Sequence, residues 1–331
     1  MDLNAPDAPQ FASATARVDA KKAGLRIQEA LPGMFPEVLP SRKSCRKALD
    51  RGDILLNGVV ADTARRVQIG DTVTLNVALQ PPTPPGKGNP TQFQWHRPPD
   101  ADYLFVWKPA GLSTSGVGNR HLAGTLAHLA HAGTPAQRTD LQPHQPDALR
   151  WPQPVHRLDR VTAGWVCIAL TLSTAQSLGQ AFAERTVHKK YLALVAGNPE
   201  NAGQSTAPLD DKAAATRWKV LGTGPLPVHG TAALIEATPE TGRTHQIRRH
   251  LALAGHAIVG EHLYQPDQTD GQPGVRYTGQ GLFLSATSLA LPAGTHGPAR
   301  SIAGPPPRKF YAVPWVRALL SIHGAQATEA S

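Results

Sequence analysis

Residues 155–164 are the part of the chain whose side chains are best placed to do chemistry. They read Val-His-Arg-Leu-Asp-Arg-Val-Thr-Ala-Gly, and an apolar run, residues 165–170, follows them. Asp159 therefore stands between Arg157 and Arg160, and this positive charge favours the ionised carboxylate. An ionised aspartate can serve as a nucleophile, a base or a salt-bridge partner. By itself, the segment favours the last of these, an ion pair at the end of a strand.

Four segments in a fixed order resemble the signature segments of the RluA-type pseudouridine synthases. One of them contains Asp159, in His-Arg-Leu-Asp followed by Thr-Ala-Gly. The resemblance implies an α+β fold with a mixed, largely antiparallel sheet and a central catalytic cleft. It also implies an isomerase that converts uridine in RNA to pseudouridine and needs no metal or organic cofactor. The matching segments are residues 106–112, 156–164, 187–195 and 241–248, and the similarity continues over residues 251–264.

The resemblance assigns three residues to catalysis. Asp159 matches the family's catalytic aspartate, and Arg248 matches the arginine that pairs with it, for which we expect a bidentate ion pair. Tyr191 matches an active-site tyrosine that could stack on the uracil and act on the proton released from the ring. Asp159 could attack the anomeric carbon, assist elimination at the neighbouring sugar carbon or add to the ring; elimination is the preferred hypothesis. The structural alternatives are an ion pair for Arg248 and a strand tyrosine for Tyr191.

Other residues of the same segments are expected to contact RNA. A target base inside folded RNA must be turned out of its stack, which costs free energy. Arg157 matches the arginine that can fill the vacated place, and Lys108 is a candidate for a phosphate contact. His156 is more typical of a positioning residue than of a reactant. The full set expected to bind substrate or RNA in these segments is His156, Arg157, Lys108, Arg243, His245 and Gln246.

Two positions depart from the family pattern. Ala163 stands where many members carry serine, so a hydrogen bond from that hydroxyl is missing. Ser285 stands where histidine is common, which puts a peripheral substrate contact in doubt. We expect neither departure to abolish the reaction, because alanine is small and leaves Asp159 accessible.

Residues 22–79 have the pattern of a small α+β module. Ser41 can cap a helix, and Asn57-Gly58 between apolar pairs predicts a tight hairpin, because both residues tolerate positive φ. The arrangement resembles the RNA-binding domain named after ribosomal small-subunit protein four, which often precedes the synthase domain. Its basic side chains would bind phosphates, which supplies affinity without base identity; the alternative is a solvated charged face. These side chains are Arg42, Lys43, Arg46, Lys47 and Arg51.

The other boundaries follow from local composition. Residues 1–21 are polar and rich in alanine, so we expect a flexible tail. Prolines crowd residues 80–100, which indicates an extended linker. Residues 101–325 would then form the synthase domain. Inside it, the polar residues 133–153 are expected to be a surface loop.

Overall composition agrees with an RNA partner. The 331 residues carry a net charge of +9, which favours a polyanion. Among the 2 cysteines and 14 histidines, no spacing matches a zinc site, so a metal enzyme is disfavoured. No apolar run approaches transmembrane length, and the first residues lack the features of a secretory signal. A cytoplasmic monomer without a membrane contact is the simplest expectation.

The choice of RNA rests on family analogy. A module that precedes the synthase domain favours ribosomal RNA, particularly of the large subunit, with transfer RNA as the alternative. Two rival functions remain: a non-catalytic RNA-binding protein on a synthase fold, and an N-glycosidase that releases uracil. Asp159, Tyr191 and Arg248 together argue against the first, because phosphate binding does not require that carboxylate.

Overall fold

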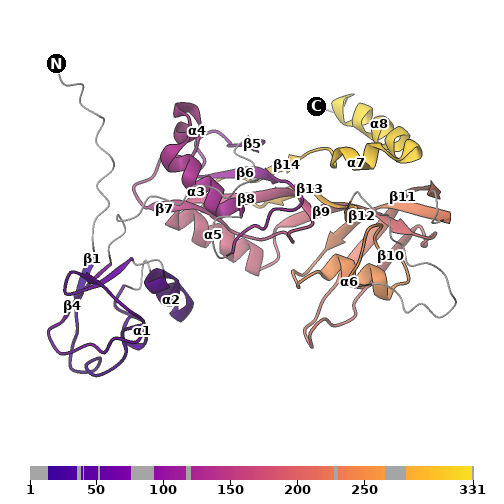
Figure 1. Cartoon of the computed structure of the whole chain (residues 1–331). Helices are drawn as coiled ribbons and strands as arrows, with labels where there is room; N and C mark the ends of the chain where they lie inside the picture. Colours follow the sequence, from indigo (N-terminus) through magenta and orange to yellow (C-terminus); the bar gives the residue numbers. More distant parts are fainter. Residues whose placement is uncertain are drawn as a thin grey trace, which may run out of the picture. The chain divides into compact units, whose positions relative to one another are not determined.

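The chain divides into two compact units, which are described separately here. The first comprises Met1–Pro81 and the second Pro82–Ser331. No helix in the described part of the chain has both the length and the apolar character needed to cross a membrane. The computed structural model (Figure 1) describes residues 14–35, 39, 41–50, 53–75, 93–116, 121–226, 230–264 and 281–329.

In its described residues, the first unit has a four-stranded antiparallel sheet, two helices and its own apolar core. The strand order is β1-β4-β2-β3, so the first described strand of the unit pairs with the last described one. A flexible tail over residues 1–21 is therefore wrong for residues 14–17, whose backbone joins the sheet beside β4. The elements are β1 (Ala14–Arg17), α1 (Ile27–Ala30), α2 (Arg42–Asp50), β2 (Ile54–Leu56), β3 (Val59–Val60) and β4 (Thr72–Leu75).

Helix α2 begins where the sequence predicts it. The Ser41 hydroxyl accepts a hydrogen bond from the backbone N–H of Ser44 at 3.1 Å, which caps the first turn. Cys45, Ala48 and Leu49 are buried against the sheet. The basic side chains of α2 are exposed on the other face, and Arg51 lies outside the described residues. The exposed basic residues are Arg42, Lys43, Arg46 and Lys47.

The predicted hairpin between β2 and β3 is also confirmed. Asn57 and Gly58 have φ angles of 52° and 82°, the left-handed region that a tight turn needs. The Asn57 amide then joins the turn to β4: it donates to the Asp71 carboxylate and accepts from the Thr72 N–H, both at 2.8 Å. The turn residue therefore fixes the register of the neighbouring strand as well.

Among its described residues, the second unit has a ten-stranded sheet of order β10-β11-β12-β9-β13-β8-β6-β5, with β14 paired to β13 and β7 paired to β8. The described pairings are antiparallel except for β13 with β8, which is parallel. The expected mixed, largely antiparallel sheet is confirmed. Its strands are β5 (Trp95–His96), β6 (Tyr103–Lys108), β7 (Ala148–Pro154), β8 (Ala163–Thr171), β9 (His188–Ala196), β10 (Ala202–Ser205), β11 (Thr216–Leu226), β12 (Gly230–Pro239), β13 (Leu284–Leu291) and β14 (Arg300–Ala303).

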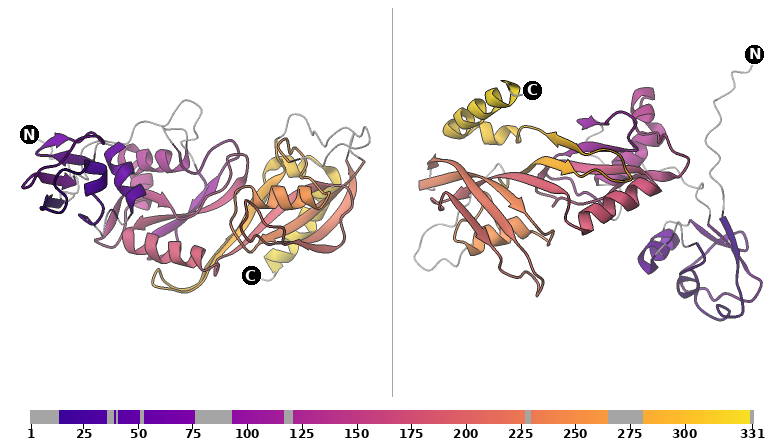
Figure 2. Two further views of the ribbon diagram at one scale, coloured as in Figure 1. Left: turned by 90° about the horizontal axis from the view of Figure 1, so that it is seen from below. Right: turned by 180° about the vertical axis from the view of Figure 1, so that it is seen from behind.

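Helices cover both faces of this sheet (Figure 2). Alternate residues of β6 point to opposite faces: Leu104 packs in one core cluster with Leu126 of α3, and Phe105 packs in another with Leu178 of α5. At the other half, α6 contributes Leu251 to a core shared with α7 and α8. The helices are α3 (Leu122–Ala132), α4 (Pro135–Asp140), α5 (Leu172–Ala183), α6 (Gln246–Leu253), α7 (Arg308–Tyr311) and α8 (Pro314–Glu329).

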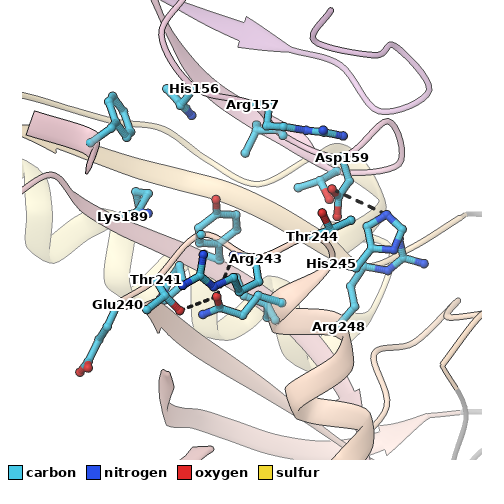
Figure 3. Close-up of a pocket in the computed structure, with 18 of the residues that line it drawn as sticks. His156, Arg157, Asp159, Lys189, Glu240, Thr241, Arg243, Thr244, His245 and Arg248 are labelled. Atoms are coloured by element: carbon cyan, nitrogen blue, oxygen red, sulfur yellow. Dashed lines mark hydrogen bonds and ion pairs between the residues drawn. The ribbon is translucent and has the colours of Figure 1, made fainter. Parts of the chain in front are cut away.

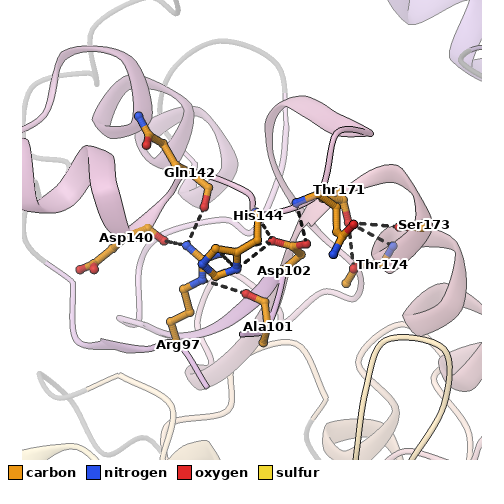
Figure 4. A network of polar contacts seen from close by, with 10 residues as sticks. Arg97, Ala101, Asp102, Asp140, Gln142, His144, Thr171, Ser173 and Thr174 are labelled. Carbon is orange, nitrogen blue, oxygen red and sulfur yellow. Dashed lines mark hydrogen bonds and ion pairs between the residues drawn. The ribbon is translucent and has the colours of Figure 1, made fainter. Parts of the chain in front are cut away.

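The polar segment 133–153 is not the surface loop that its composition suggests. It contains α4 and β7, and a buried ion-pair network holds its middle against the sheet (Figure 4). The Asp102 carboxylate accepts from Arg97 Nη2 at 3.3 Å and from the His144 backbone N–H at 2.6 Å. Arg97 also donates to two carbonyls of the segment. These contacts satisfy polar groups that a mobile loop would leave to water.

The same network corrects the second boundary of the expected linker. Residues 80–92 lie outside the described residues, but residues 93–100 belong to the second unit. Trp95 pairs with Val106 across β5 and β6, and Arg97 contacts the carbonyl of Ala101 at 2.8 Å. The expected linker is therefore wrong for residues 93–100, which contain the edge strand β5, and it stays a prediction for residues 80–92.

Candidate active site

Asp159 lies in the loop between β7 and β8, at the entrance to a strand that is buried along its whole length. Thr114 fixes this loop through two hydrogen bonds. Its hydroxyl donates to the Leu158 carbonyl and accepts from the Leu158 N–H, both at 3.0 Å. The Thr162 N–H closes the turn on the Asp159 carbonyl at 3.0 Å. The backbone on both sides of Asp159 is therefore fixed before any substrate binds.

Lys108 also supports this loop, and it is not available to RNA. Its side chain is fully buried, and Nζ donates to the carbonyls of Leu112 at 2.7 Å, Pro109 at 3.1 Å and Arg160 at 3.5 Å. Burial lowers the pKa of this amine to about 7, against the opposing effect of the Asp159 charge. The expected phosphate contact is therefore wrong: Lys108 connects the turn after β6 to the loop that carries Asp159.

The parallel contact between β8 and β13 explains the small residues after Asp159. Gly164 has a φ of 137°, and a Cβ atom there would lie 2.3 Å from the Ala286 carbonyl oxygen. Ala163 is the register partner of Ser285, whose buried hydroxyl donates to the Ala163 carbonyl at 3.4 Å. The two departures from the family pattern thus face each other in the sheet. Ser285 cannot contact substrate, because it is fully buried.

A cavity of about 450 Å³ opens beside Asp159 (Figure 3). Residues from β9, from the loop before α6 and from α6 itself form its other walls. Asp159, Tyr191 and Arg248 all line it, so the structure brings together three side chains that are far apart in sequence. Five of the six residues expected to bind substrate also line it, and Lys108 does not. Those five are His156, Arg157, Arg243, His245 and Gln246.

Arg248 is bound to a residue other than the expected one. Its Nε and Nη2 donate to the two carboxylate oxygens of Glu261, both at 2.7 Å, and both side chains are almost completely buried. Burial opposes the charge on Arg248, but the hydrogen bonds and charge of Glu261, with a contribution from Asp159, raise its pKa. The predicted bidentate pair with Asp159 is therefore wrong. Arg248 acts on Asp159 through its field rather than through a hydrogen bond.

His245 faces the Asp159 carboxylate across the cavity. Its Nε2 is 3.8 Å from Asp159 Oδ1, and its Nδ1 forms a hydrogen bond of 2.8 Å with the Tyr264 hydroxyl. Its φ of 53° is left-handed, an arrangement that costs free energy in a residue other than glycine. At this position before α6, the His245 side chain faces Asp159 (Figure 3).

Tyr191 is positioned by its strand pairing. It lies on β9 opposite Ala237 of β12 and Ala286 of β13, two small residues that leave room for the ring. Burial, and then the negative charge of Asp159, raise the pKa of its phenol. Tyr191 therefore stays neutral and can offer a hydroxyl and a ring face to a base in the cavity.

His156 and Gln246 are structural members of the cavity wall. His156 stacks on Phe182 with ring centroids 4.5 Å apart, and its Nε2 accepts from the Cys167 N–H at 3.0 Å. Burial and the nearby Lys189 lower the pKa of His156 to about 3, so its ring is neutral. The positioning role expected for His156 agrees with these contacts.

Gln246 uses its whole amide on protein groups. Its oxygen accepts from the Thr241 hydroxyl at 2.6 Å and from the Arg243 N–H at 3.0 Å. Its nitrogen donates to the Ala215 carbonyl at 2.8 Å and to the Thr216 hydroxyl at 3.0 Å. The expectation that Gln246 contacts RNA is therefore wrong. Its hydrogen bonds instead fix the turn that contains Arg243 and His245.

Three residues of this site were not expected from the sequence. Glu261 follows Val259-Gly260 within residues 251–264, where the similarity to the family continues, and this position was the available signal. Arg185 and Lys189 line the cavity on its basic side, and burial lowers the pKa of Lys189. Nothing in the spacing of Arg185 marks it, since it lies in the turn between α5 and β9.

Metal binding has no candidate in the described residues: they contain no group of three or more histidine, cysteine, aspartate or glutamate side chains that could hold an ion. The two cysteines, Cys45 and Cys167, are free and buried. Burial raises the pKa of both thiols, so neither is activated as a nucleophile.

Comparisons with known proteins identify the family of the chain. Residues 102–253 match the family model described as RNA pseudouridylate synthase. The chain is 33% identical over 259 residues to the ribosomal large subunit pseudouridine synthase D of Xylella fastidiosa, covering 73% of this chain and 72% of that protein. It is 30% identical over 296 residues to the protein of the same name from Nitrosomonas europaea, covering 82% and 78%.

A solved structure is similar in fold. The human protein RNA pseudouridylate synthase domain containing 1 superposes with a TM-score of 0.51 and 22% sequence identity. The match covers 68% of this chain and 88% of that one. At this identity the similarity concerns the fold alone.

Proposed function

Because the chain belongs to the RNA pseudouridylate synthase family, of the RluA type, we propose that Asp159 is its catalytic carboxylate and large-subunit ribosomal RNA its substrate. The protein is an RNA pseudouridine synthase, an isomerase. The finer assignments, which residue starts the reaction and which RNA is modified, are the proposal.

The observation that carries the assignment is the placement of Asp159 in the cavity. Its side chain is 19% exposed, so it can reach a substrate while most of it is shielded from water. Tyr191 and Arg248 line the same cavity, and the negative charge of Asp159 raises the pKa of both. Glu240, the other acid in the wall, is exposed and pairs with Arg217 at 2.6 Å.

The neighbouring side chains divide the work around Asp159. The Tyr191 ring offers a stacking face for uracil, and its neutral hydroxyl can take part in moving the proton from the ring carbon. Arg248, held by Glu261, supplies a fixed positive charge that favours the ionised Asp159. Arg157 is exposed at the rim, where it can occupy the place of an extruded base.

The first unit is proposed to bind RNA as a separate module. Its helix α2 presents Arg42, Lys43, Arg46 and Lys47 to solvent on one face. Such a row of cations neutralises phosphates and contributes affinity that does not depend on base identity. Selection of the uridine would then come from the cavity of the second unit.

Large-subunit ribosomal RNA is proposed from the names of the relatives. Both bacterial relatives described above are called ribosomal large subunit pseudouridine synthase D. Mapping pseudouridines in RNA from cells with and without this protein tests the proposal. Loss of a site in large-subunit ribosomal RNA supports it, and loss confined to transfer RNA contradicts it.

The variant Asp159→Asn tests the catalytic assignment. We expect it to form no pseudouridine in a single turnover while its RNA affinity stays within a few-fold, because binding is mainly electrostatic. Glu240→Gln is the matched control, since it removes a carboxylate from the same cavity wall. Product analysis separates the rivals: free uracil would identify an N-glycosidase, and unchanged RNA from the wild-type protein a non-catalytic binder.

A further inference from the structure

A second cavity, of about 220 Å³, adjoins the first at Asp159. Asp159, Arg157 and His245 line both cavities, so the carboxylate stands between them. We propose that the second cavity binds a phosphodiester group of the substrate RNA adjacent to the target uridine. This inference rests on the proposed function, since it takes Asp159 as the group that meets the uridine.

The lining of the second cavity matches the chemistry of a phosphate. Arg157 and Arg160 are exposed, and neither guanidinium has a hydrogen bond or ion pair with another residue in the described part of the chain. Ser113 and Ser115 add hydroxyl groups to the opposite wall. Guanidinium forks and hydroxyls are the donors that proteins use for phosphate oxygens. The two positive charges of Arg157 and Arg160 also exceed the single negative charge of Asp159, so the lining has a net positive charge.

The walls of this cavity are fixed by contacts inside the protein. Thr114 joins one wall to the other through its two hydrogen bonds with the backbone of Leu158. The Arg160 carbonyl accepts from the Gly111 N–H at 2.7 Å and from buried Lys108. The serine wall and the arginine wall are thus held together without a ligand, which lowers the entropy cost of binding.

A base is a poor fit for the same space. The lining residues include no phenylalanine, tyrosine or tryptophan, and Leu158 is the apolar member. The one aromatic ring among them, His245, already contacts Tyr264 and Asp159 through its two nitrogens. A nucleobase needs a stacking face, and the first cavity supplies Tyr191 and Phe182 for that purpose. The division follows from the chemistry: the base enters the first cavity, the sugar meets Asp159, and a linkage flanking that sugar reaches the second cavity.

Neutral linkages in the RNA test the inference. A short RNA with the target uridine is prepared with natural linkages, and with a methylphosphonate in place of each flanking phosphate in turn. Single-turnover pseudouridine formation is measured with the wild-type protein and with Arg160→Gln. We expect one neutral linkage to slow the wild-type reaction about tenfold, and Arg160→Gln to slow the natural RNA by a similar factor.

The decisive comparison combines the two changes. If Arg160 binds that phosphate, Arg160→Gln loses little more activity on the sensitive methylphosphonate RNA, because the contact is already absent. Multiplicative losses, or a wild-type rate that no neutral linkage changes, would overturn the inference. Arg308→Gln, an exposed arginine that lines neither cavity, controls for overall charge. A wild-type protein that forms no pseudouridine would instead contradict the proposed function itself.

Discussion

Arg248, which lines the cavity that contains Asp159, donates from two nitrogens of its guanidinium to the buried carboxylate of Glu261. Glu261 Oε1 also accepts from the backbone N–H groups of His262 and Leu263, both at 2.9 Å. The guanidinium is therefore fixed by an anion that has no access to substrate. The positive charge of Arg248 therefore acts on Asp159 while the guanidinium stays bound to Glu261.

Glu261→Gln is expected to lower the free energy of unfolding by about 3 kcal/mol, because it leaves a buried guanidinium without its main counter-charge. Urea unfolding followed by fluorescence measures the change. Glu240→Gln, which breaks an exposed pair, should cost less than about 1 kcal/mol. Equal losses in the two variants would mean that the buried pair has no special weight.

Tyr191→Phe should keep the stacking face and lose the hydroxyl. If that hydroxyl moves the ring proton, the single-turnover rate falls by about 100-fold while the RNA dissociation constant changes little. Because the pKa of Tyr191 is raised, the wild-type rate should show no loss from phenol ionisation below about pH 10. A Phe variant with wild-type rate would leave Tyr191 as a packing residue.

His156 should make the fold sensitive to acid. The unfolded chain protonates this histidine near its ordinary pKa of about 6.5, whereas the folded protein does so only near pH 3. The unfolded state therefore binds more protons between these values, and stability falls as the pH is lowered through that window. The contribution is at most about 1.4 kcal/mol per pH unit.

Urea unfolding at several pH values measures this contribution. His156→Gln, which keeps an acceptor for the Cys167 N–H and does not titrate, should show a shallower decline than wild type below pH 6.5. Parallel curves for the two proteins would mean that His156 is not the titrating group.

Replacing Arg42, Lys43, Arg46 and Lys47 by glutamine should weaken RNA binding and flatten its salt dependence. If all four contact phosphates, the slope of log affinity against log salt becomes less negative by about 3. Filter binding at several salt concentrations measures it. The rate of the fully bound complex should stay near the wild-type value, and an unchanged slope would exclude α2 from the RNA interface.

Local chemistry decided the parts of the structure that the sequence could predict. The cap at Ser41, the hairpin at Asn57-Gly58 and the basic face of α2 depend on neighbours within a few residues. The order and residue types of the four family segments likewise led to the fold class and to the three residues Asp159, Tyr191 and Arg248. Such features depend on a short peptide or on a motif, so they can be predicted before the tertiary structure is known.

The tertiary structure alone decided which side chains contact each other and which of them are buried. Lys108 has the residue type of a phosphate ligand, but its amine meets the carbonyl of Arg160, which is 52 positions further on. Arg248 interacts electrostatically with two carboxylates, those of Asp159 and Glu261. Its hydrogen bonds go to Glu261, because the fold brings the segment before Tyr264 against α6. The sequence determines the hydrogen-bond donors and the charge of a side chain. Its partner depends on which distant segment of the chain the fold brings next to it.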